Sequence, residues 1–316
     1  MFFALQEHVS GHAAEAGHGA PEPFDAGRTI VEHVSNSAAA HPLVRLPTIA
    51  GIDFSVTKHV LMLWLVSAVV LVVVTWTVRR YLKQDRLVPS GLANALEFAV
   101  EFIRDTIVLP NVGSKWVNTW APLVLTLFVF ILCANAIGLI PVFEVVGLID
   151  HWVLHTSDGS FLKQLLHGGT TATANFNVTA ALATITFGSI IVAGSKAHGF
   201  VAHWKNLVPH GLAWPIYILL IPIEIMGMLV RPFALTMRLA ANMTGGHIAI
   251  LAILSFVFLF AQLFGGAVAG IGVGLVVSVP LASLISGLEI LVVLIQAYVF
   301  TLLTAVFIGM AIHAHH

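Results

Sequence analysis

Six apolar segments, each long enough to cross a bilayer as a helix, constrain this chain more than any other feature. A helix needs about 20 apolar residues to span the ~30 Å hydrocarbon core. Hydrophobic residues make up 58% of the chain and charged residues only 9%, against roughly 25% charged in a soluble domain. The sequence therefore predicts an all-α, polytopic membrane protein, with segments near 59–78, 119–142, 177–195, 212–236, 246–277 and 281–312.

The fourth and fifth segments have no loop-like interruption between them. The first convincing turn is the glycine-rich stretch 265–274. We therefore expect one long, tilted or broken helix over 212–262, with 280–312 as its returning partner. That interpretation reduces the count to about five membrane-embedded helices, the last two forming a hairpin over about 212–312. Three prolines can bend the first of these two helices: Pro215, Pro222 and Pro232.

The distribution of Lys and Arg predicts the topology, because basic connections stay in the cytoplasm. The connections after the first and third segments are basic, whereas the connection over about 143–174 carries Lys163 beside three acidic residues. Residues 1–58 are mildly acidic, so we expect them to form an extracytoplasmic tail ahead of a membrane domain at 59–316. The C-terminus then lies in the cytoplasm. A further stretch, about 91–109, predicts an amphipathic helix on the cytoplasmic face.

From position 212 onward the chain has four residues of the types Asp, Glu, Lys and Arg: Glu224, Arg231, Arg238 and Glu289. A charge inside a bilayer costs at least a few kcal/mol, so these residues need either a function or ion pairs that hold helices together. The first three recur every seven residues, which places them on one stripe of a helix. Asn242 follows Arg238 by one turn on the same stripe.

Two further residues complete a candidate path for protons. In an outward-running helix His247 lies beyond Arg238, and the returning helix brings Glu289 to about the depth of His247, with Gln296 two turns deeper. A histidine titrates near neutral pH and a carboxylate partner raises its proton affinity. Arg238 keeps its proton. The pattern favours two half-paths separated by a fixed positive charge, in which another group carries the proton past the arginine.

Two motifs resemble subunit a of the F-type ATP synthase: residues 231–247, RPFALTMRLAANMTGGH, and residues 296–306, QAYVFTLLTAV. Weaker matches are Asn135 with residues 139–141, and residues 177–179. The resemblance covers roughly residues 55–312. It implies the role of a proton-translocating stator subunit, which couples proton flow to ATP synthesis through two offset half-channels.

The resemblance also implies roles for matching residues. Arg238 is expected to be the stator arginine that faces a rotating ring of c subunits and passes their carboxylates. Asn242 and Gln296 are expected to flank it in the outer half-channel. His247 and Glu289 match the coupled acid–base pair, with the two residue types exchanged relative to the usual bacterial arrangement.

Glu224 matches a polar position of the cytoplasmic half-channel. The implied partners are the c-subunit ring, the peripheral-stalk b subunits, other ATP synthase subunits and lipid, in a bacterial inner membrane. The resemblance implies a non-catalytic subunit, with no cofactor, metal or ATP chemistry in this chain. Two departures are Gly138, where the family frequently has an acid, and the unusual stretch 148–169.

Other classes of protein fit less well. An autonomous secondary ion transporter would also have broken helices and a buried charged site, but the chain has no obvious internal repeat. The sixteen histidines suggest metal handling, yet no His-Glu-x-x-His or cysteine-containing site accompanies them. An intramembrane protease is not indicated, because the chain has no Gly-x-Ser-x-Gly motif. The net charge of -1 gives no support for nucleic-acid binding.

Overall fold

The computed structural model describes residues 47–49, 52–53, 55–83, 88–139, 172–205, 214–263 and 272–313, with Gly27 and Val268 as isolated positions. In chain order the elements are β1 (Thr48–Ile49), β2 (Ile52–Asp53), α3 (Lys58–Leu82), α4 (Leu92–Glu101), η1 (Phe102–Val108), α5 (Leu109–Val112), α6 (Val117–Leu139), η3 (Ala172–Ala174), α9 (Phe176–His198), α10 (Phe200–Lys205), α11 (Trp214–Leu263), η4 (Gly274–Ser278) and α13 (Val279–Ile312).

Five of these helices are long and apolar enough to cross a membrane. They are α3, α6, α9, α11 and α13, and they confirm the predicted all-helical, polytopic architecture. The merged helix predicted over 212–262 is the single helix α11, which has 50 residues. Most of the predicted tail 1–58, of the predicted outer connection 143–174 and of the predicted turn 265–274 lies outside the described residues. The short antiparallel pair β1–β2 precedes α3.

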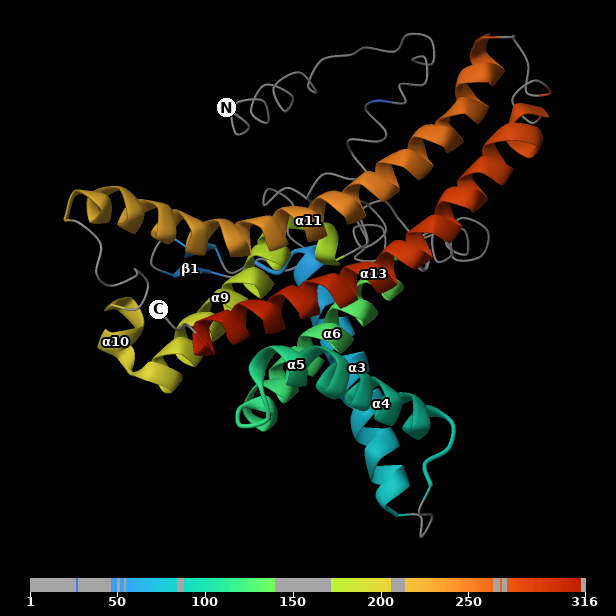
Figure 1. The fold of residues 1–316 in the computed structure, drawn as a ribbon. Coiled ribbons are helices and arrows are strands. Elements are labelled where there is room, and N and C mark those ends of the chain that lie inside the picture. The colour runs from blue at the N-terminus through green and yellow to red at the C-terminus, as the bar shows by residue number, and fades with distance from the viewer. Residues whose placement is uncertain are drawn as a thin grey trace.

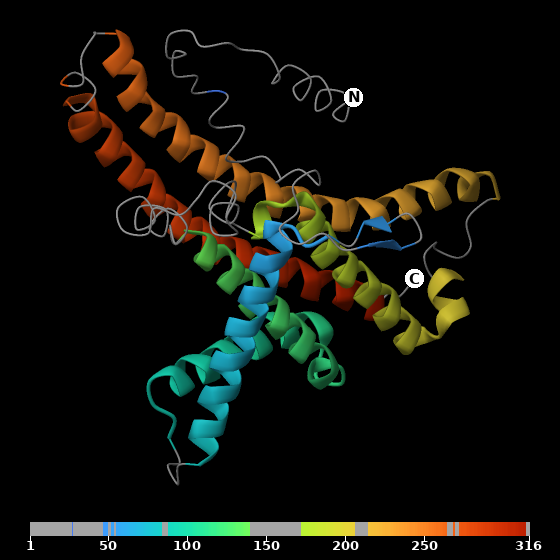
Figure 2. The same ribbon diagram turned by 180° about the vertical axis from the view of Figure 1, so that it is seen from behind.

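The two long helices α11 and α13 form a pair. Figures 1 and 2 show them side by side along most of their length, with α3 crossing this pair. The helix α13 packs against α6, α11 and α9, while α3 contacts α6 and α4. The long pair is therefore supported from one side by α6 and α9.

Two clusters of apolar side chains fasten α13 to its supports. One joins η1, α6, α9 and the end of α13 through fully buried residues that include Ile107, Val124, Ala193 and Ile308. The other joins α6 and α9 to the middle of the hairpin, where Leu235 and Leu239 of α11 meet Phe300 of α13. Lipid tails are as apolar as the helix surfaces, so the hydrophobic effect does not drive the helices together. Close packing of this kind therefore holds the bundle together.

The helix α11 bends along its length (Figures 1 and 2). Pro222 and Pro232 both lie inside it. A proline within a helix removes one backbone hydrogen bond and pushes away the carbonyl of the preceding turn. The Thr236 hydroxyl donates a hydrogen bond to the carbonyl of Pro232, one turn earlier in the same helix, at 2.9 Å.

The amphipathic segment predicted at 91–109 is helical, and it changes character along its length. The helix α4 buries none of its residues. The next seven residues widen into the π-helix η1, which buries Ile103, Ile107 and Val108. A glycine, Gly309, lets the end of α13 lie directly against the backbone of Asn111, where any side chain would collide.

A sharp reversal joins α9 to the short helix α10. Gly199 adopts a φ of 92°, a backbone conformation that favours glycine. The turn returns the His203 ring onto Gly194 of α9, which has no side chain in its way. Burial lowers the pKa of His203, and repulsion from neighbouring His198 lowers it further. Both effects favour the neutral form of the His203 ring.

A buried hydrogen bond joins η3 to α6. The Thr173 hydroxyl donates to the Asn135 side-chain oxygen at 2.5 Å, and both residues are fully buried. The Asn175 side chain then accepts from the Asn177 backbone N–H at 2.8 Å and caps the start of α9. Asn135 therefore holds the start of η3, and with it the segment that leads into α9, against α6.

Thr173→Val should destabilise the chain, because it removes a donor and leaves the Asn135 oxygen buried without a partner. We expect a loss of about 1–3 kcal/mol in the free energy of unfolding, seen as a lower thermal denaturation temperature of the purified protein. Thr184→Val is the matched control, since that exposed hydroxyl bonds only to its own helix, to Ala180. Equal melting temperatures for the two variants would contradict this role.

Candidate ion-translocation site

Arg238 lies on an exposed face of the hairpin α11–α13. Its side chain is exposed, although it lies in the middle of a membrane-spanning helix. Within the part of the chain that the structure describes, no hydrogen bond or ion pair engages its guanidinium group. Because a permanent positive charge is expensive in hydrocarbon, this arginine needs water or a partner from outside the described residues.

The backbone behind Arg238 is held firmly. Its near neighbours on the helix, Leu235 one turn earlier and the adjacent Leu239, are 2% and 0% exposed and pack against α6, α9 and α13. The arginine is therefore presented by a helix whose adjoining face is anchored in the apolar core.

Asn242 and Gln296 meet across the hairpin. The Asn242 side-chain amide donates a hydrogen bond to the Gln296 side-chain oxygen at 2.9 Å. Asn242 is exposed on the same stripe as Arg238, whereas Gln296 is buried between the helices. The structure thus brings together the two amide residues that the sequence places near the arginine, and their bond fixes the register of α11 against α13.

Glu289 packs against Gly246, the residue before His247. The Glu289 side chain is buried, and its carboxylate lies against Gly246, where a Cβ atom would collide with it. Gly246 immediately precedes His247 in α11. The absence of a side chain at position 246 therefore makes room for the carboxylate, one residue along α11 from His247.

Glu224 lies apart from these residues. It is half-exposed near the beginning of α11, about 21 Å from Arg238 by helical rise. Among the described residues, no hydrogen bond or ion pair ties it to the rest of the site. The separation agrees with two distinct polar regions on either side of Arg238.

Arg231 differs from Arg238 although both occur on the same predicted stripe. Its guanidinium lies over the Phe307 ring of α13, 5.5 Å from the ring centre. A cation above an aromatic face is stabilised within the chain itself. The two arginines thus have different environments: Arg231 contacts α13, whereas Arg238 is exposed.

Exposed apolar side chains form a stripe along α13. Its exposed members recur at helical spacing: Leu284, Leu288, Leu291 and Ile295. Residues three and four apart lie on one face of a helix. In a membrane protein such a face contacts lipid or another membrane subunit.

Sequence reasoning missed three contributors to this region. Gly246 makes room for Glu289, Phe307 holds Arg231, and the Thr244 hydroxyl donates to the Ala174 carbonyl at 3.4 Å, connecting α11 to η3. The pair Gly245–Gly246 beside His247 was the available signal for close packing. The other two contacts join distant positions that no local pattern relates.

Metal binding finds no structural support in the described part of the chain, where no group of three His, Cys, Asp or Glu side chains could hold an ion. The histidines of the N-terminal tail that suggested metal handling lie outside the described residues.

Comparison with known proteins decides the family. The sequence profile described as ATP synthase A chain matches residues 60–309. The chain belongs to this family. It is 40% identical over 309 residues to the ATP synthase subunit a 2 of Chlorobium luteolum, covering 95% of this chain and 79% of that protein.

Two further relatives agree with this assignment. The chain is 38% identical to the ATP synthase subunit a 2 of Prosthecochloris aestuarii, over 95% of this chain and 84% of that protein. It is 37% identical to the ATP synthase subunit a of Chloroherpeton thalassium, over 94% of this chain and 79% of that protein. Membership makes this chain a membrane-embedded subunit of the ATP synthase complex, with the proton-translocating stator role in an F-type ATP synthase.

Gly246→Ala should force the Glu289 carboxylate away from α11. We expect it to lower the free energy of unfolding of the purified chain by about 1–3 kcal/mol, as overpacking does. Gly245→Ala is the control, because a methyl group there meets no atom within 4 Å. Thermal denaturation of both variants beside the wild type measures the difference. If Gly246→Ala were as stable as Gly245→Ala, the close approach of Glu289 would be refuted.

Proposed function

We propose that the hairpin α11–α13 forms two offset proton half-channels and presents Arg238 to the carboxylates of a c-subunit ring. His247 and Glu289 serve the outer half-channel, where they exchange protons with the outer aqueous phase. Asn242 and Gln296 lie between that pair and Arg238. Glu224 serves the inner half-channel.

The observation that carries this proposal is the exposed guanidinium of Arg238, which has no partner among the described residues and stands on a rigid membrane helix. A ring carboxylate protonated from the outer half-channel is neutral and can turn through lipid, whereas a bare carboxylate would be costly there. When the carboxylic acid returns to this chain it releases its proton inward and passes Arg238 as an anion. The arginine favours the ionised carboxylate and repels a proton crossing directly between the half-channels.

The geometry gives each half of the path its own environment. The outer residues are packed between two helices, with Glu289 buried and Gln296 hydrogen-bonded to Asn242. Glu224, on the other side of Arg238, is half-exposed near one end of α11. This offset supports proton entry and exit at different positions around the ring.

The partners and orientation follow from the same proposal. The exposed apolar stripe of α13, together with Arg238, is the surface we assign to the c ring. Other subunits, including the b subunits of the peripheral stalk, complete the complex. The basic ends of α3 and α9 face the cytoplasm of a bacterium, the N-terminal tail lies outside the inner membrane, and the C-terminus is cytoplasmic.

Arg238→Gln should abolish ATP-driven proton pumping in inverted membrane vesicles that contain the assembled complex. The reason is that no fixed charge remains to favour the ionised ring carboxylate. We expect at least a hundredfold loss of the acidification rate, because a lost charge interaction of about 3 kcal/mol corresponds to that factor. Passive proton leak through complexes stripped of the soluble head should not fall.

Arg231→Gln is the matched control, on the same helix two turns away. Its guanidinium is satisfied by Phe307, so we expect the variant to retain most of its pumping. Assembly of both variants is checked by co-purification with the ring. Near wild-type pumping by Arg238→Gln, or equal loss in the two variants, would refute the stator role of Arg238.

A further inference from the structure

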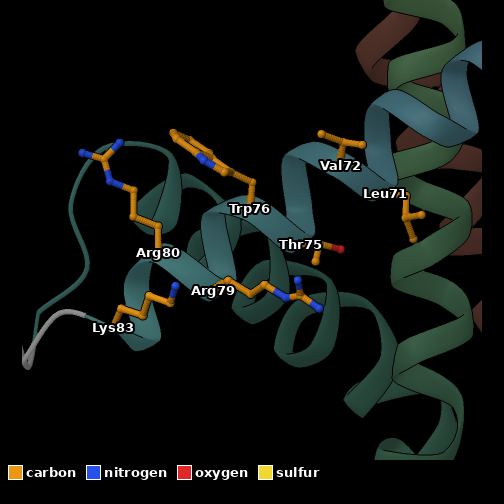
Figure 3. A pocket seen from close by; sticks show the side chains of 7 residues that line it. All are labelled: Leu71, Val72, Thr75, Trp76, Arg79, Arg80 and Lys83. Atoms are coloured by element: carbon orange, nitrogen blue, oxygen red, sulfur yellow. The ribbon is translucent and has the colours of Figure 1, made fainter.

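The last turns of α3 carry a stripe that changes from apolar to basic. Its members lie on neighbouring turns of the helix and line a shallow hollow of about 610 Å³: Leu71, Val72, Thr75, Trp76, Arg79, Arg80 and Lys83. Figure 3 shows that Trp76 lies between the aliphatic side chains and the three cations. The stripe is about 18 Å long by helical rise, which is enough to run from hydrocarbon into the headgroup region.

Arg80 and Trp76 form the centre of this surface. The Arg80 guanidinium lies over the Trp76 ring, 5.2 Å from its centre. Stacking on an indole restricts the guanidinium while leaving its N–H groups available at the edge. Tryptophan is itself enriched at the boundary between hydrocarbon and headgroups.

A second hollow of about 550 Å³ opens on the other side of the same two residues. It lies between the end of α3 and the beginning of α4, and Thr77, Ser90 and Gly91 also line it. Thr77 is only 5% exposed, and its hydroxyl has no hydrogen-bond partner among the described residues. The first turn of α4 has no side-chain cap, since Gly91 occupies the N-cap position. Free N–H groups at a helix N-terminus attract an anion.

The cations of the stripe are not neutralised within the described chain. Among the residues that the structure places, no carboxylate forms an ion pair with Arg79, Arg80 or Lys83. The surface therefore combines unpaired positive charge, an unpartnered buried hydroxyl and an adjoining apolar wall. An anion that carries a hydrocarbon chain satisfies all three features.

We propose that this surface binds an anionic glycerophospholipid. Its phosphate lies between Arg80, the Thr77 hydroxyl and the first turn of α4, while Arg79 and Lys83 contribute positive charge. An acyl chain follows Leu71 and Val72 along α3. The bound lipid fills the space between α3 and α4 and holds α4 against the membrane surface.

Native mass spectrometry of the purified full-length chain in detergent tests the proposal. Dioleoylphosphatidylglycerol is the anionic probe and dioleoylphosphatidylcholine the zwitterionic one, each titrated to obtain the affinity of the first bound lipid. We expect the wild type to bind phosphatidylglycerol more tightly. Arg79→Gln with Arg80→Gln should weaken that binding about thirtyfold, since each cation near a membrane surface contributes roughly fivefold. Binding of phosphatidylcholine should change less than about twofold.

Two further variants separate a built site from general charge. Lys115→Gln with Lys196→Gln removes two exposed cations elsewhere, and it should leave phosphatidylglycerol affinity within about twofold of the wild type. Thr77→Val keeps all charges, and it should weaken binding several-fold because the phosphate loses a hydrogen-bond donor.

The contrary outcomes are clear. Equal losses in the two double variants would reduce the effect to net charge and overturn the site. Equal affinity of the wild type for the two lipids would do the same. Displacement of the lipid by millimolar inorganic phosphate would assign the anion site to free phosphate rather than lipid. Retained phosphatidylcholine binding and an unchanged melting temperature verify that each variant is folded.

Discussion

The energetic cost of a guanidinium group inside a membrane organises this molecule. Arg238 cannot lose its proton at physiological pH, and hydrocarbon cannot solvate it. The structure anchors the adjoining face of its helix through Leu235 and Leu239 and leaves the charge exposed. A charge held rigidly, and left unsatisfied by the described part of its own chain, acts on whatever carboxylate an adjacent subunit brings to it. The stator role follows from this combination of rigidity and incomplete compensation.

The remaining polar contacts keep two long helices in one register around that charge. Asn242 binds Gln296 across the hairpin, Glu289 sits on Gly246, and Thr186 meets Thr304 between α9 and α13 at 3.3 Å. Each contact is buried or half-buried, where a displaced polar group would lack a substitute partner. Sliding α11 against α13 by one turn would break the first two at once. The hairpin therefore has one favourable register, and it places the outer polar residues at a fixed distance from Arg238.

The sequence predicted the spans and the long hairpin because each follows from a local pattern. Apolar length identifies helices, and sevenfold spacing identifies a stripe on one of them. A contact between distant segments can be predicted only where residue types imply a shared location, as for Asn242 and Gln296, which the structure joins by a hydrogen bond. The cation–π contact of Arg231 with Phe307 and the widening of the chain into η1 depend on how helices meet in three dimensions. Helical periodicity alone gives no information about either.

Cysteine cross-linking in the assembled complex tests most directly whether an outside subunit covers Arg238. Ala241 is exposed three residues from the arginine, whereas neighbouring Ala240 is buried at 8% exposure. Each is replaced by cysteine in a Cys133→Ser background and paired with a cysteine placed beside the ring carboxylate. The account predicts that Ala241→Cys forms a disulfide with the c subunit in membranes and that Ala240→Cys does not. Absence of the Ala241→Cys product in a complex that contains the ring, or equal products from both positions, would contradict it.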